Sequence, residues 1–435
     1  MIVRGGTVVT ARGVEKADIV VNHGRITEVG PDLEGFGQVV DASGLHVFPG
    51  GIDSHVHFNE PGRTEWEDIA HGTSALAAGG YTSFIDMPLN NLPVTTTVEA
   101  FDLKLAAMER SARIDFGLWA GLVPGNLDQL GPLVARGAMG FKAFMCPSGI
   151  DEFPPSDLDT LREGMARIAE LGSILLAHAE SPAVLADPRG RSAAEFIASR
   201  PPEAEIEAIG ALIAIARDTG CRTHVVHVTT VQGMTMLAEA QLRGVDMSGE
   251  TCPHYLLYAD EDLERLGGVG KCFPPFRSAG NRDDLRAMLA AGEIEMVVSD
   301  HSPSTLELKA GDDFRTVWGG ISGCQSTRQL LLAHDGLELP LVAAVTATRI
   351  AERFGIKDKG DIGPGFDADL WLVDLDHPGV VRREDLLYRN RFSAHEGQKI
   401  RGRTVKTLVR GLEPSNGERI RPFGDDQTGS PPTRE

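Results

Sequence analysis

The middle of the chain repeats one pattern eight times: a short apolar segment, then a longer stretch rich in Ala, Leu, Glu and Arg. The apolar segments are GIDSHVHF, YTSFIDMP, IDFGLWAGLV, GFKAFM, SILLAHAES, RTHVVHVTT, VDMSGETCPHYL and IEMVVSDHSP. Most intervening stretches suit helices, and two of them, EWEDIAHGTSALAAGG and IEAIGALIAIARDTG, end at Gly, a common helix stop. This alternation predicts an α/β fold, a (β/α)8 TIM barrel. An open doubly wound sheet is the alternative, but no GxGxxG follows the first strand to favour dinucleotide binding.

The two ends of the chain differ from this middle part. Residues 1–50 contain short β-branched segments punctuated by Gly, such as MIVRGGTVVT and ADIVVNHGRITEVG. Near the other end, GPGFDADLWLVDLD and TVKTLVRG have the same character. We therefore expect residues 1–50 and 351–422 to form one small β domain around a barrel at 51–350. Residues 423–435 are predicted to be a disordered tail.

Composition narrows the classes of function. The formal net charge is −20 across 435 residues, which argues against nucleic acid and anionic membrane surfaces as partners, because both need clustered Lys and Arg. No run of about 18 apolar residues indicates a membrane span, and the first residues do not resemble a signal peptide. The five cysteines are odd in number and include no CxxC, which is typical of reduced thiols. A cytoplasmic location is therefore expected.

Polar residues gather where the barrel strands are expected to end, and chemistry in such a barrel lies at those ends. His55 and His57 close the first apolar segment, and residues i and i+2 of a strand face the same side, so both imidazoles enter one space. A lone strand His is more often a core residue, and Asp300 alone could be a cap. The convergence of several such side chains nevertheless predicts a metal site. The set comprises His55, His57, Lys142, His178, His227 and Asp300.

Imidazole and carboxylate ligands together suit Zn²⁺ and similar ions. Three further histidines stand outside the set. His224 faces elsewhere in its strand and is interpreted as structural. For His254 and His301, packing competes evenly with a supporting or substrate role.

Lys142 is the unusual member of the set. Like charge and burial both lower the pKa of a lysine beside divalent cations, so its amine would be neutral there. The other interpretation is a surface lysine that extends to water, but the surrounding GAMGFKAFM is apolar. A neutral amine can react with CO₂ to form a carbamate (N6-carboxylysine). Such a group would bridge two metal ions about 3.5–4 Å apart.

These motifs resemble those of the cyclic amidohydrolases, the family of dihydroorotases, hydantoinases (dihydropyrimidinases) and allantoinases. The resemblance covers nearly the whole chain, from GGIDSHVHFNEPG through GFKAF, AHAES, VVHVTT, ETCPHYL and SDHSP to GPGFDADLWLVD and RGRTVKTLVRG. It implies a metal-bearing barrel, a small β-sandwich built from both termini, and a homo-oligomer, often a homotetramer. It also implies two divalent ions, with Zn expected and Mn, Co, Fe or Ni as alternatives, held by His55, His57, carbamylated Lys142, His178, His227 and Asp300.

Within this family the details are most similar to allantoinases, which act in purine (ureide) breakdown. Dihydroorotases typically have an Arg at the position of Asn59 that pairs with the substrate carboxylate, and its loss removes a bidentate clamp. Hydantoinases commonly carry a Tyr five residues after the bridging lysine, where this chain has Pro147. NEPGRTEWE, DMPLN and SGIDEFP instead resemble allantoinases, whereas Ser304, where those proteins often have Cys, and SAHEG at 393–397 depart from the usual pattern.

The resemblance therefore implies hydrolysis of a small cyclic amide, allantoin to allantoate. A metal-bridging hydroxide would attack the ring carbonyl, and Asp300 would act as general base and then as general acid. The alternatives are a hydantoinase, dihydropyrimidinase or dihydroorotase acting on a related ring, and a non-catalytic scaffold, against which the retention of all six ligands counts. The expected substrate contacts are Asn59, Ser148, Phe273, Ser302, Gly319 and Gly320.

Overall fold

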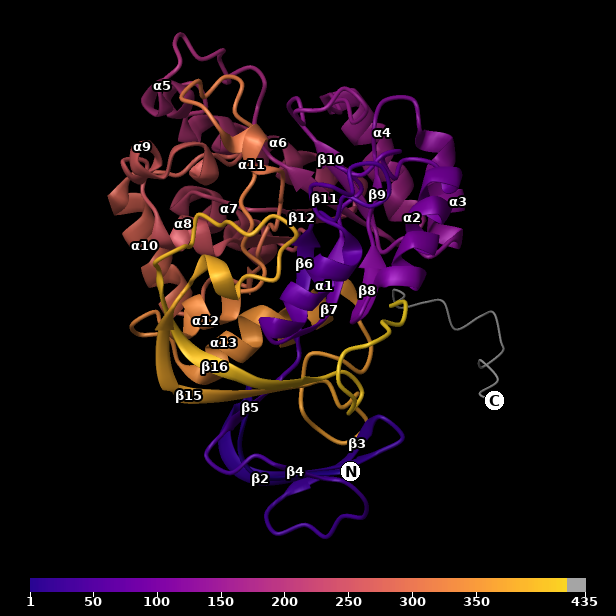
Figure 1. Ribbon diagram of the computed structural model, residues 1–435. Helices are drawn as coiled ribbons and strands as arrows, with labels where there is room; N and C mark the ends of the chain where they lie inside the picture. Colours follow the sequence, from indigo (N-terminus) through magenta and orange to yellow (C-terminus); the bar gives the residue numbers. More distant parts are fainter. Residues whose placement is uncertain (421–435) are drawn as a thin grey trace.

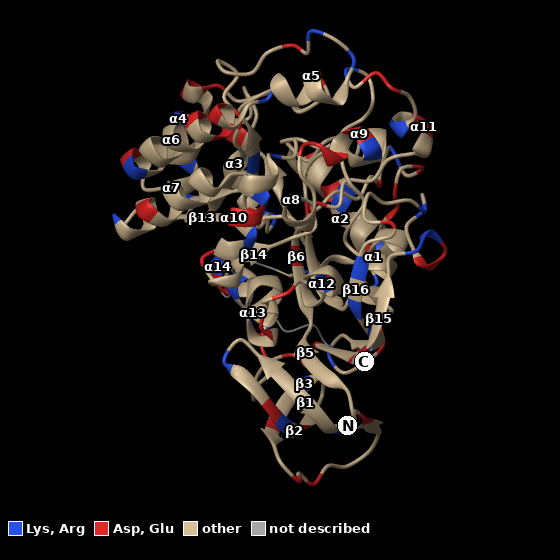
Figure 2. Cartoon of the chain, turned by 90° about the vertical axis from the view of Figure 1, so that its left-hand side faces the viewer, with Lys and Arg blue, Asp and Glu red and all other residues tan. Residues whose placement is uncertain are grey.

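A computed structural model describes residues 1–420 of the chain. Figure 1 shows strands in the middle of the upper part with helices around them, and a β domain below that holds the N-terminus. Figure 2 shows the same arrangement from the side, with β5 (His46–Pro49) of the β domain leading up toward β6 (Gly51–Val56) of the barrel.

The barrel is built from parallel strands. They are β6, β7 (Tyr81–Asp86), β8 (Asp115–Leu118), β9 (Ala120–Gly121), β10 (Phe141–Phe144), β11 (Ile174–His178), β12 (Arg222–Val225), β13 (Met247–Thr251) and β14 (Met296–Val297). Strand β8 pairs with β7, and β9 pairs with β10. Strands β8 and β9 therefore form one interrupted strand, with Trp119 between them. A parallel bridge between Val56 and His301 joins the first strand to the last. Each predicted apolar segment forms a strand, and the predicted TIM barrel is confirmed.

Helices cover the outside of the ring (Figure 1). They are α1 (Ile69–Ala78), α2 (Val98–Ser111), α3 (Leu130–Ala135), α4 (Leu158–Glu170), α5 (Ala193–Ala198), α6 (Pro202–Thr219), α7 (Val231–Leu242), α8 (Pro253–Leu257), α9 (Asp262–Leu266), α10 (Ala279–Ala290), α11 (Leu306–Lys309), α12 (Thr327–Leu332), α13 (Leu339–Ala343) and α14 (Arg349–Phe354), with short helical turns η1 (Leu127–Gln129), η2 (Gly267–Gly270), η3 (Ala344–Thr348) and η4 (Arg383–Asp385). Asp68 caps α1 by accepting a hydrogen bond from the His71 N–H. Helix α6 ends at Gly220, whose φ of +69° lies in the left-handed region that glycine adopts without strain.

The β domain draws on both ends of the chain. Its strands are β1 (Ile2–Thr10), β2 (Gly13–Asn22), β3 (Arg25–Gly30), β4 (Val39–Asp41), β5, β15 (Leu370–Val380) and β16 (Lys399–Leu408). They form a seven-stranded sheet in the order β16-β15-β5-β1-β2-β3, with β4 on β1, and the antiparallel pairing of β5 with β15 joins the two chain ends. This confirms a β domain built from both termini. Its boundaries with the barrel stay a prediction, and the tail predicted at 423–435 lies outside the described residues.

Two buried cations join the β domain to the barrel. The Lys359 ammonium lies 2.7 Å from a carboxylate oxygen of Asp115, in barrel strand β8, and 2.8 Å from one of Asp369, beside β15. The Arg328 guanidinium donates hydrogen bonds to the carbonyls of Gly80 and Pro49 and lies 4.2 Å from the Trp371 ring centroid. The floor of the barrel is thus fixed to the β domain by charge-assisted contacts.

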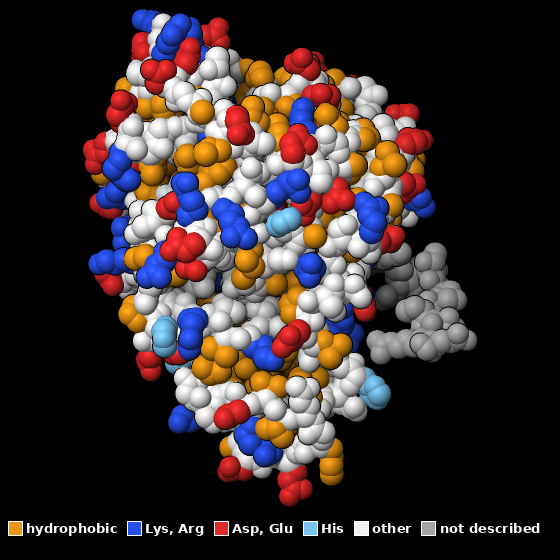
Figure 3. Space-filling model, in the orientation of Figure 1, with side chains coloured by type: hydrophobic (Ala, Val, Ile, Leu, Met, Phe, Trp, Pro, Cys, Tyr) orange, Lys and Arg blue, Asp and Glu red, His pale blue; other side chains and the backbone are white. Residues whose placement is uncertain are grey.

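The outer surface carries charges of both signs. On the face shown in Figure 3, acidic and basic side chains are interspersed rather than gathered into a patch of one sign. Among residues 1–420, every helix is too short or too polar to cross a bilayer.

Candidate metal centre

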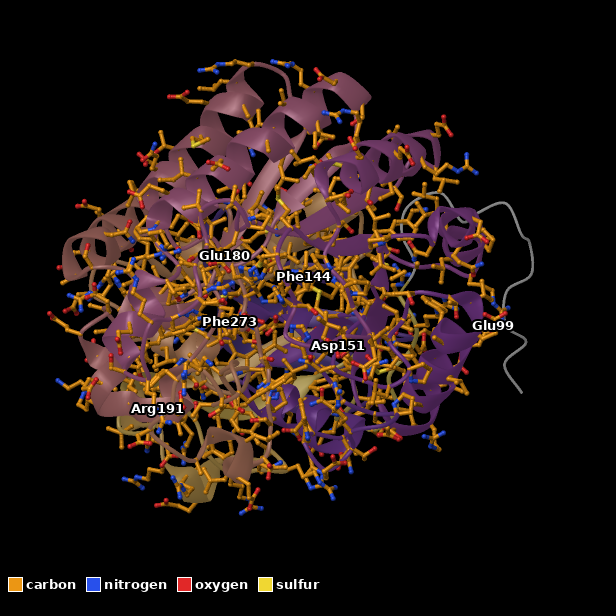
Figure 4. All side chains as sticks on the ribbon, turned by 90° about the horizontal axis from the view of Figure 1, so that it is seen from above. Glu99, Phe144, Asp151, Glu180, Arg191 and Phe273 are labelled. Carbon is orange, nitrogen blue, oxygen red and sulfur yellow. The ribbon has the colours of Figure 1, made fainter. Side chains whose placement is uncertain are left out.

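The carboxyl ends of the barrel strands open into a cavity of about 340 Å³. Seen from above in Figure 4, the wall residues Phe144 and Phe273 lie near the middle of the ring, whereas Glu99 lies at its outer edge. The six predicted ligands all line this cavity and are all buried: His55, His57, Lys142, His178, His227 and Asp300. The structure thus brings the six side chains around one space, and their roles as ligands stay a prediction.

The His55 and His57 side chains both approach one carboxylate oxygen of Asp300. The Nε2 atoms of His55 and His57 lie 3.1 and 3.4 Å from Oδ1 of Asp300. Each imidazole has a hydrogen-bond acceptor at its other nitrogen, since Nδ1 of His57 lies 3.1 Å from the Leu89 carbonyl and Nδ1 of His55 lies 2.5 Å from Glu250. Both Nδ1 atoms therefore carry the proton and both Nε2 atoms carry a lone pair. Lone pairs facing a carboxylate repel it unless a cation lies among them.

His178 and His227 face each other in the same way. Nδ1 of His178 lies 3.0 Å from Nε2 of His227, and burial lowers the pKa of both imidazoles, so neither is protonated near neutral pH. Nε2 of His178 is bonded to Glu180, which leaves the lone pair on the nitrogen that faces His227. Two of the set also have strained backbones, with φ of +42° at His227 and +44° at Asp300, a conformation that non-glycine residues keep mainly at functional sites.

The Lys142 amine has no partner. Its Nζ is fully buried, makes no hydrogen bond among the described residues, and lies 4.9 Å from the Phe144 ring centroid. Burial lowers its pKa to about 7, so much of the amine is neutral at physiological pH. A buried, unpaired amine that opens on a cavity costs free energy unless something binds it. A carbamate formed with CO₂ would turn this cost into a pair of anionic oxygens.

The donor set therefore fits divalent metal ions. Nitrogen lone pairs from four histidines, the Asp300 carboxylate and the Lys142 amine converge on one buried cavity, and His55, His57 and Asp300 offer ligand atoms within 4.8 Å of one another. Nitrogen and oxygen donors without thiolates suit Zn²⁺ and its neighbours in the first transition row.

Glu250, at the end of β13, supports the ligands and was not singled out from the sequence. Its carboxylate is fully buried and accepts hydrogen bonds from His55 and from Nε2 of His224 at 3.0 Å. Although burial alone would raise it, the pKa of Glu250 is lowered to about 2 by these two imidazoles. Metal-binding histidines usually donate their second N–H to such a carboxylate, which fixes the tautomer. His224 is thus structural, as its strand position indicated.

Glu180 plays the same part for His178. Its Oε2 accepts from Nε2 of His178 at 2.7 Å, and Arg200 donates to both of its oxygens. Although burial opposes the charge, Arg200 and His178 lower the pKa of Glu180 to about 2. Figure 4 shows Glu180 near the middle of the molecule, and it is not among the cavity-lining residues. The only sequence sign of Glu180 and Glu250 is an acidic residue inside an otherwise apolar strand-end motif.

Most of the predicted substrate contacts face the cavity. Ser148, Phe273, Ser302, Gly319 and Gly320 all line it. Asn59 does not: its amide lies 3.5 Å from the Pro303 carbonyl, and its Oδ1 is buried without a partner among the described residues. His254 and His301 are likewise buried outside the cavity lining.

Asn90 is a cavity residue that the sequence reasoning missed, although it lies within the quoted DMPLN motif. Its backbone has a φ of +63°, and its carbonyl accepts a hydrogen bond from Arg63 at 3.1 Å. Its side-chain amide makes no hydrogen bond among the described residues and lines the cavity. It can therefore offer one donor and one acceptor group to a polar ligand.

A parallel barrel with buried histidines, a lysine and an aspartate at its strand ends defines a metal-dependent hydrolase of the barrel type. Residues 46–413 match the model of the amidohydrolase family. The chain belongs to this family.

Individual relatives agree with this assignment. The chain is 48% identical to an allantoinase from Rubrobacter xylanophilus, with 97% of this chain and 95% of that protein covered, and 45% identical to an allantoinase from Solibacter usitatus, with 96% and 94% covered. Among solved structures, the L-hydantoinase of Arthrobacter aurescens superposes with a TM-score of 0.92 at 30% identity, covering 97% of this chain and 99% of that one. The dihydropyrimidinase of Brevibacillus agri gives 0.89 at 28%, with 97% and 98% covered.

Proposed function

We propose that this chain is an allantoinase, which opens the hydantoin ring of allantoin with water to give allantoate. The observation that carries the proposal is the full-length similarity to allantoinases, at 48% identity, in a chain whose cavity keeps all six predicted ligands. This reaction would place the protein in purine (ureide) catabolism.

The cavity suits an uncharged polar ring. Besides Lys142, two basic side chains line it, and both are bonded to the protein itself. Lys271 donates to the carbonyls of Phe314 and Val317, and Arg315 forms a two-point ion pair with Asp313. Among residues 1–420, no guanidinium of the cavity lining is therefore left free to clamp a substrate carboxylate, which counts against dihydroorotate.

The donor set described above would hold two divalent ions, with Zn expected and Mn, Co, Fe or Ni as alternatives. His55, His57, His178, His227 and Asp300 would hold these ions together with Lys142, whose carbamate would add anionic oxygens to the donor set. When bound, such ions polarise an amide carbonyl and lower the pKa of water so that it attacks at neutral pH.

Asp300 would move the proton. Divalent cations held beside it would favour its charged form, so the group would begin as a carboxylate. It would take one proton from the attacking water as the C–O bond forms. It would then give this proton to the ring nitrogen as the C–N bond breaks, leaving a neutral nitrogen and a carboxylic acid that releases its own proton to solvent at neutral pH.

Polar groups of the cavity wall would hold the ring. The N–H and C=O of Gly319 make no hydrogen bond among the described residues, and the Asn90 amide is also free. Ser302 and the backbone near Ser148 and Phe273 remain proposed contacts, and so does Asn59, which would have to turn toward the cavity. Cyclic ureides present alternating N–H and C=O groups that such a wall can match.

A hydantoinase or dihydropyrimidinase is the second candidate. The structural neighbours named above support it, because their folds cover nearly the whole chain. Against it stand their lower identity and Pro147 in place of the tyrosine expected in hydantoinases. A homotetramer is proposed from the family likeness alone. A cytoplasmic location is proposed from the five cysteines, all of which are free and buried.

The test is ring opening by purified protein reconstituted with Zn²⁺ and bicarbonate, across allantoin, hydantoin, dihydrouracil and dihydroorotate, with Lys142→Ala as the blank. Turnover of allantoin far above the other rings, lost in the variant, is the expected result. Preference for another ring would refute allantoin as the substrate but would still support a cyclic-amide hydrolase. A metal-loaded protein that opens none of these rings would refute both the allantoin substrate and the cyclic-amide hydrolase class.

A further inference from the structure

Residues 314–320, here called the wall segment, close one side of the cavity. Arg315, Thr316, Val317, Trp318, Gly319 and Gly320 all line it. The segment contains a turn but no helix or strand, so regular backbone hydrogen bonding does not hold it in place. Something else must fix its conformation.

Lys271, which also lines the cavity, holds the first half of the wall segment. Its Nζ donates hydrogen bonds of 2.6 Å to the carbonyls of Phe314 and Val317. The same ammonium lies 5.0 and 5.1 Å from the ring centroids of Phe196 and Phe273. Lys271 is only 3% exposed, so water does not replace these contacts.

Lys309 holds the second half of the wall segment by hydrogen bonds. Its Nζ donates to the Trp318 carbonyl at 2.9 Å, to the Gly320 carbonyl, and to the Lys271 carbonyl at 3.4 Å. The Gly320 N–H returns a hydrogen bond of 2.8 Å to the same Lys271 carbonyl, which ties the two lysines together. Lys309 is 4% exposed.

Burial lowers the pKa of Lys271 to about 8 and that of Lys309 to about 7, and neither amine has an ion-pair partner among residues 1–420. A buried amine is costly, whether charged or neutral, unless its N–H donors are satisfied, and here the wall segment supplies the acceptors. The carbonyls of Phe314, Val317, Trp318 and Gly320 therefore point toward the two lysines and are not free to accept from a ligand.

Gly319 lies between Trp318 and Gly320, whose carbonyls accept from Lys309, but its own backbone groups contact neither lysine. Its N–H and C=O are left free, and a Cβ there would lie 2.3 Å from the Phe273 ring, so its backbone packs directly on that side chain. With the peptides on both sides anchored by lysines, the Gly319 groups have one direction left, toward the cavity that they line.

We propose that Lys271 and Lys309 are positioning residues, which fix the wall segment so that the Gly319 N–H and C=O meet the substrate ring. The inference rests on the proposed function for the identity of that ring, and it adds that ring binding depends on two lysines acting through the backbone. Losing either lysine should loosen substrate binding and leave the metal ligands in place.

The experiment compares Lys271→Met and Lys309→Met with wild type in three readouts on the Zn-loaded protein. These are amide hydrogen exchange of peptides covering 310–322, the split between KM and kcat, and metal content. Lys359→Met is the control, because Lys359 is also buried but is held by aspartates at the β domain. We expect faster exchange in the wall segment, a KM raised on the order of tenfold for the loss of charge-assisted hydrogen bonds, a smaller change in kcat, and unchanged metal content.

Unchanged exchange or unchanged KM in both methionine variants would overturn the proposal, as would the same KM increase in Lys359→Met. If a methionine variant does not fold, Lys271→Gln or Lys309→Gln, which keep two N–H donors, take its place under the same criteria. The exchange measurement needs no substrate. If wild type fails to open allantoin while wall-segment exchange still rises in the variants, the proposed substrate falls and the positioning role stands.

Discussion

Glu250 offers the sharpest test of how the cavity holds metal, because one buried carboxylate orients two imidazoles. The changes are Glu250→Gln and Glu250→Leu. A glutamine can still accept from Nδ1 of His55 and can donate to Nε2 of His224, whose other nitrogen, 2.7 Å from the Ser248 hydroxyl, would then carry the proton. It loses only the negative charge. A leucine loses the acceptor as well, so the His55 proton is free to move to the nitrogen that should face the metal.

The magnitudes follow from this difference. Removing a partner that orients a metal-binding histidine costs about 10–100-fold in metal affinity, or about 1.4–2.7 kcal/mol. We expect about tenfold for Glu250→Gln and about 100-fold for Glu250→Leu. The assay titrates metal-free protein with Zn²⁺ against a competing chelator and follows bound metal directly, so that it does not depend on the identity of the substrate.

The control is Asp369→Asn, a buried carboxylate that contacts Lys359 in the β domain and not the cavity. Its metal affinity should match that of wild type. A folded Glu250→Leu protein that binds both ions as tightly as wild type would refute the reasoning, since a free tautomer would then carry no cost. Equal losses in Glu250→Gln and Glu250→Leu would assign the effect to charge alone.

Three further outcomes follow from the described contacts. Lys142→Ala should lose roughly 100-fold or more of its turnover, and a short carboxylic acid added to the assay should restore part of it by supplying the missing oxygens. Burial raises the pKa of Glu67 to about 8, so its neutral form stabilises the fold at low pH and this contribution is lost as the pH rises through about 8. Urea unfolding should therefore find Glu67→Gln close to wild type at pH 5 and more stable than wild type at pH 9, by on the order of a few kcal/mol. Lys104→Met should cost about 3–5 kcal/mol in the same measurement, because Asp86, 2.8 Å from the Lys104 ammonium, is left charged and buried, and adding Asp86→Asn should recover part of the loss.

The fold was predictable because its signs are local. A strand that ends in polar residues and a helix that ends at Gly are each visible within a short window of sequence. The same holds for His55 and His57, whose spacing alone puts them on one side of a strand. The pairing of β5 with β15 joins residues far apart in the chain, yet it too could be expected, because the two ends share a composition that the middle lacks.

The support of the site was not predictable in this way. Glu250 is 195 residues from the imidazole that it orients, and no spacing rule connects the two. Asn59 was expected to face the cavity because it is two residues from His57, and it does not. The strand has already ended before Asn59, whose backbone N–H donates to the Glu67 carbonyl, so the alternation of side-chain directions along a strand no longer applies. Side-chain direction just past a strand end is set by loop contacts that only the folded chain contains.

Carboxylates hold the histidines of this cavity and lysines hold its backbone wall, and the difference follows from the groups to be held. An imidazole that presents a lone pair to a metal has a proton on its other nitrogen, so the group behind it must accept, and Glu180 and Glu250 do so. A wall built from peptide backbone needs the reverse, since carbonyls turned away from the ligand need donors, and an ammonium has three donors and no lone pair. Carboxylates therefore stand behind the histidines, and Lys271 and Lys309 stand behind the wall segment. Because Glu250 and Lys309 contact no side chain in common, metal affinity and ring selectivity should respond to separate substitutions. Changes at Glu250 should weaken metal binding without altering which ring is preferred, and changes at Lys309 should alter ring binding without weakening metal binding.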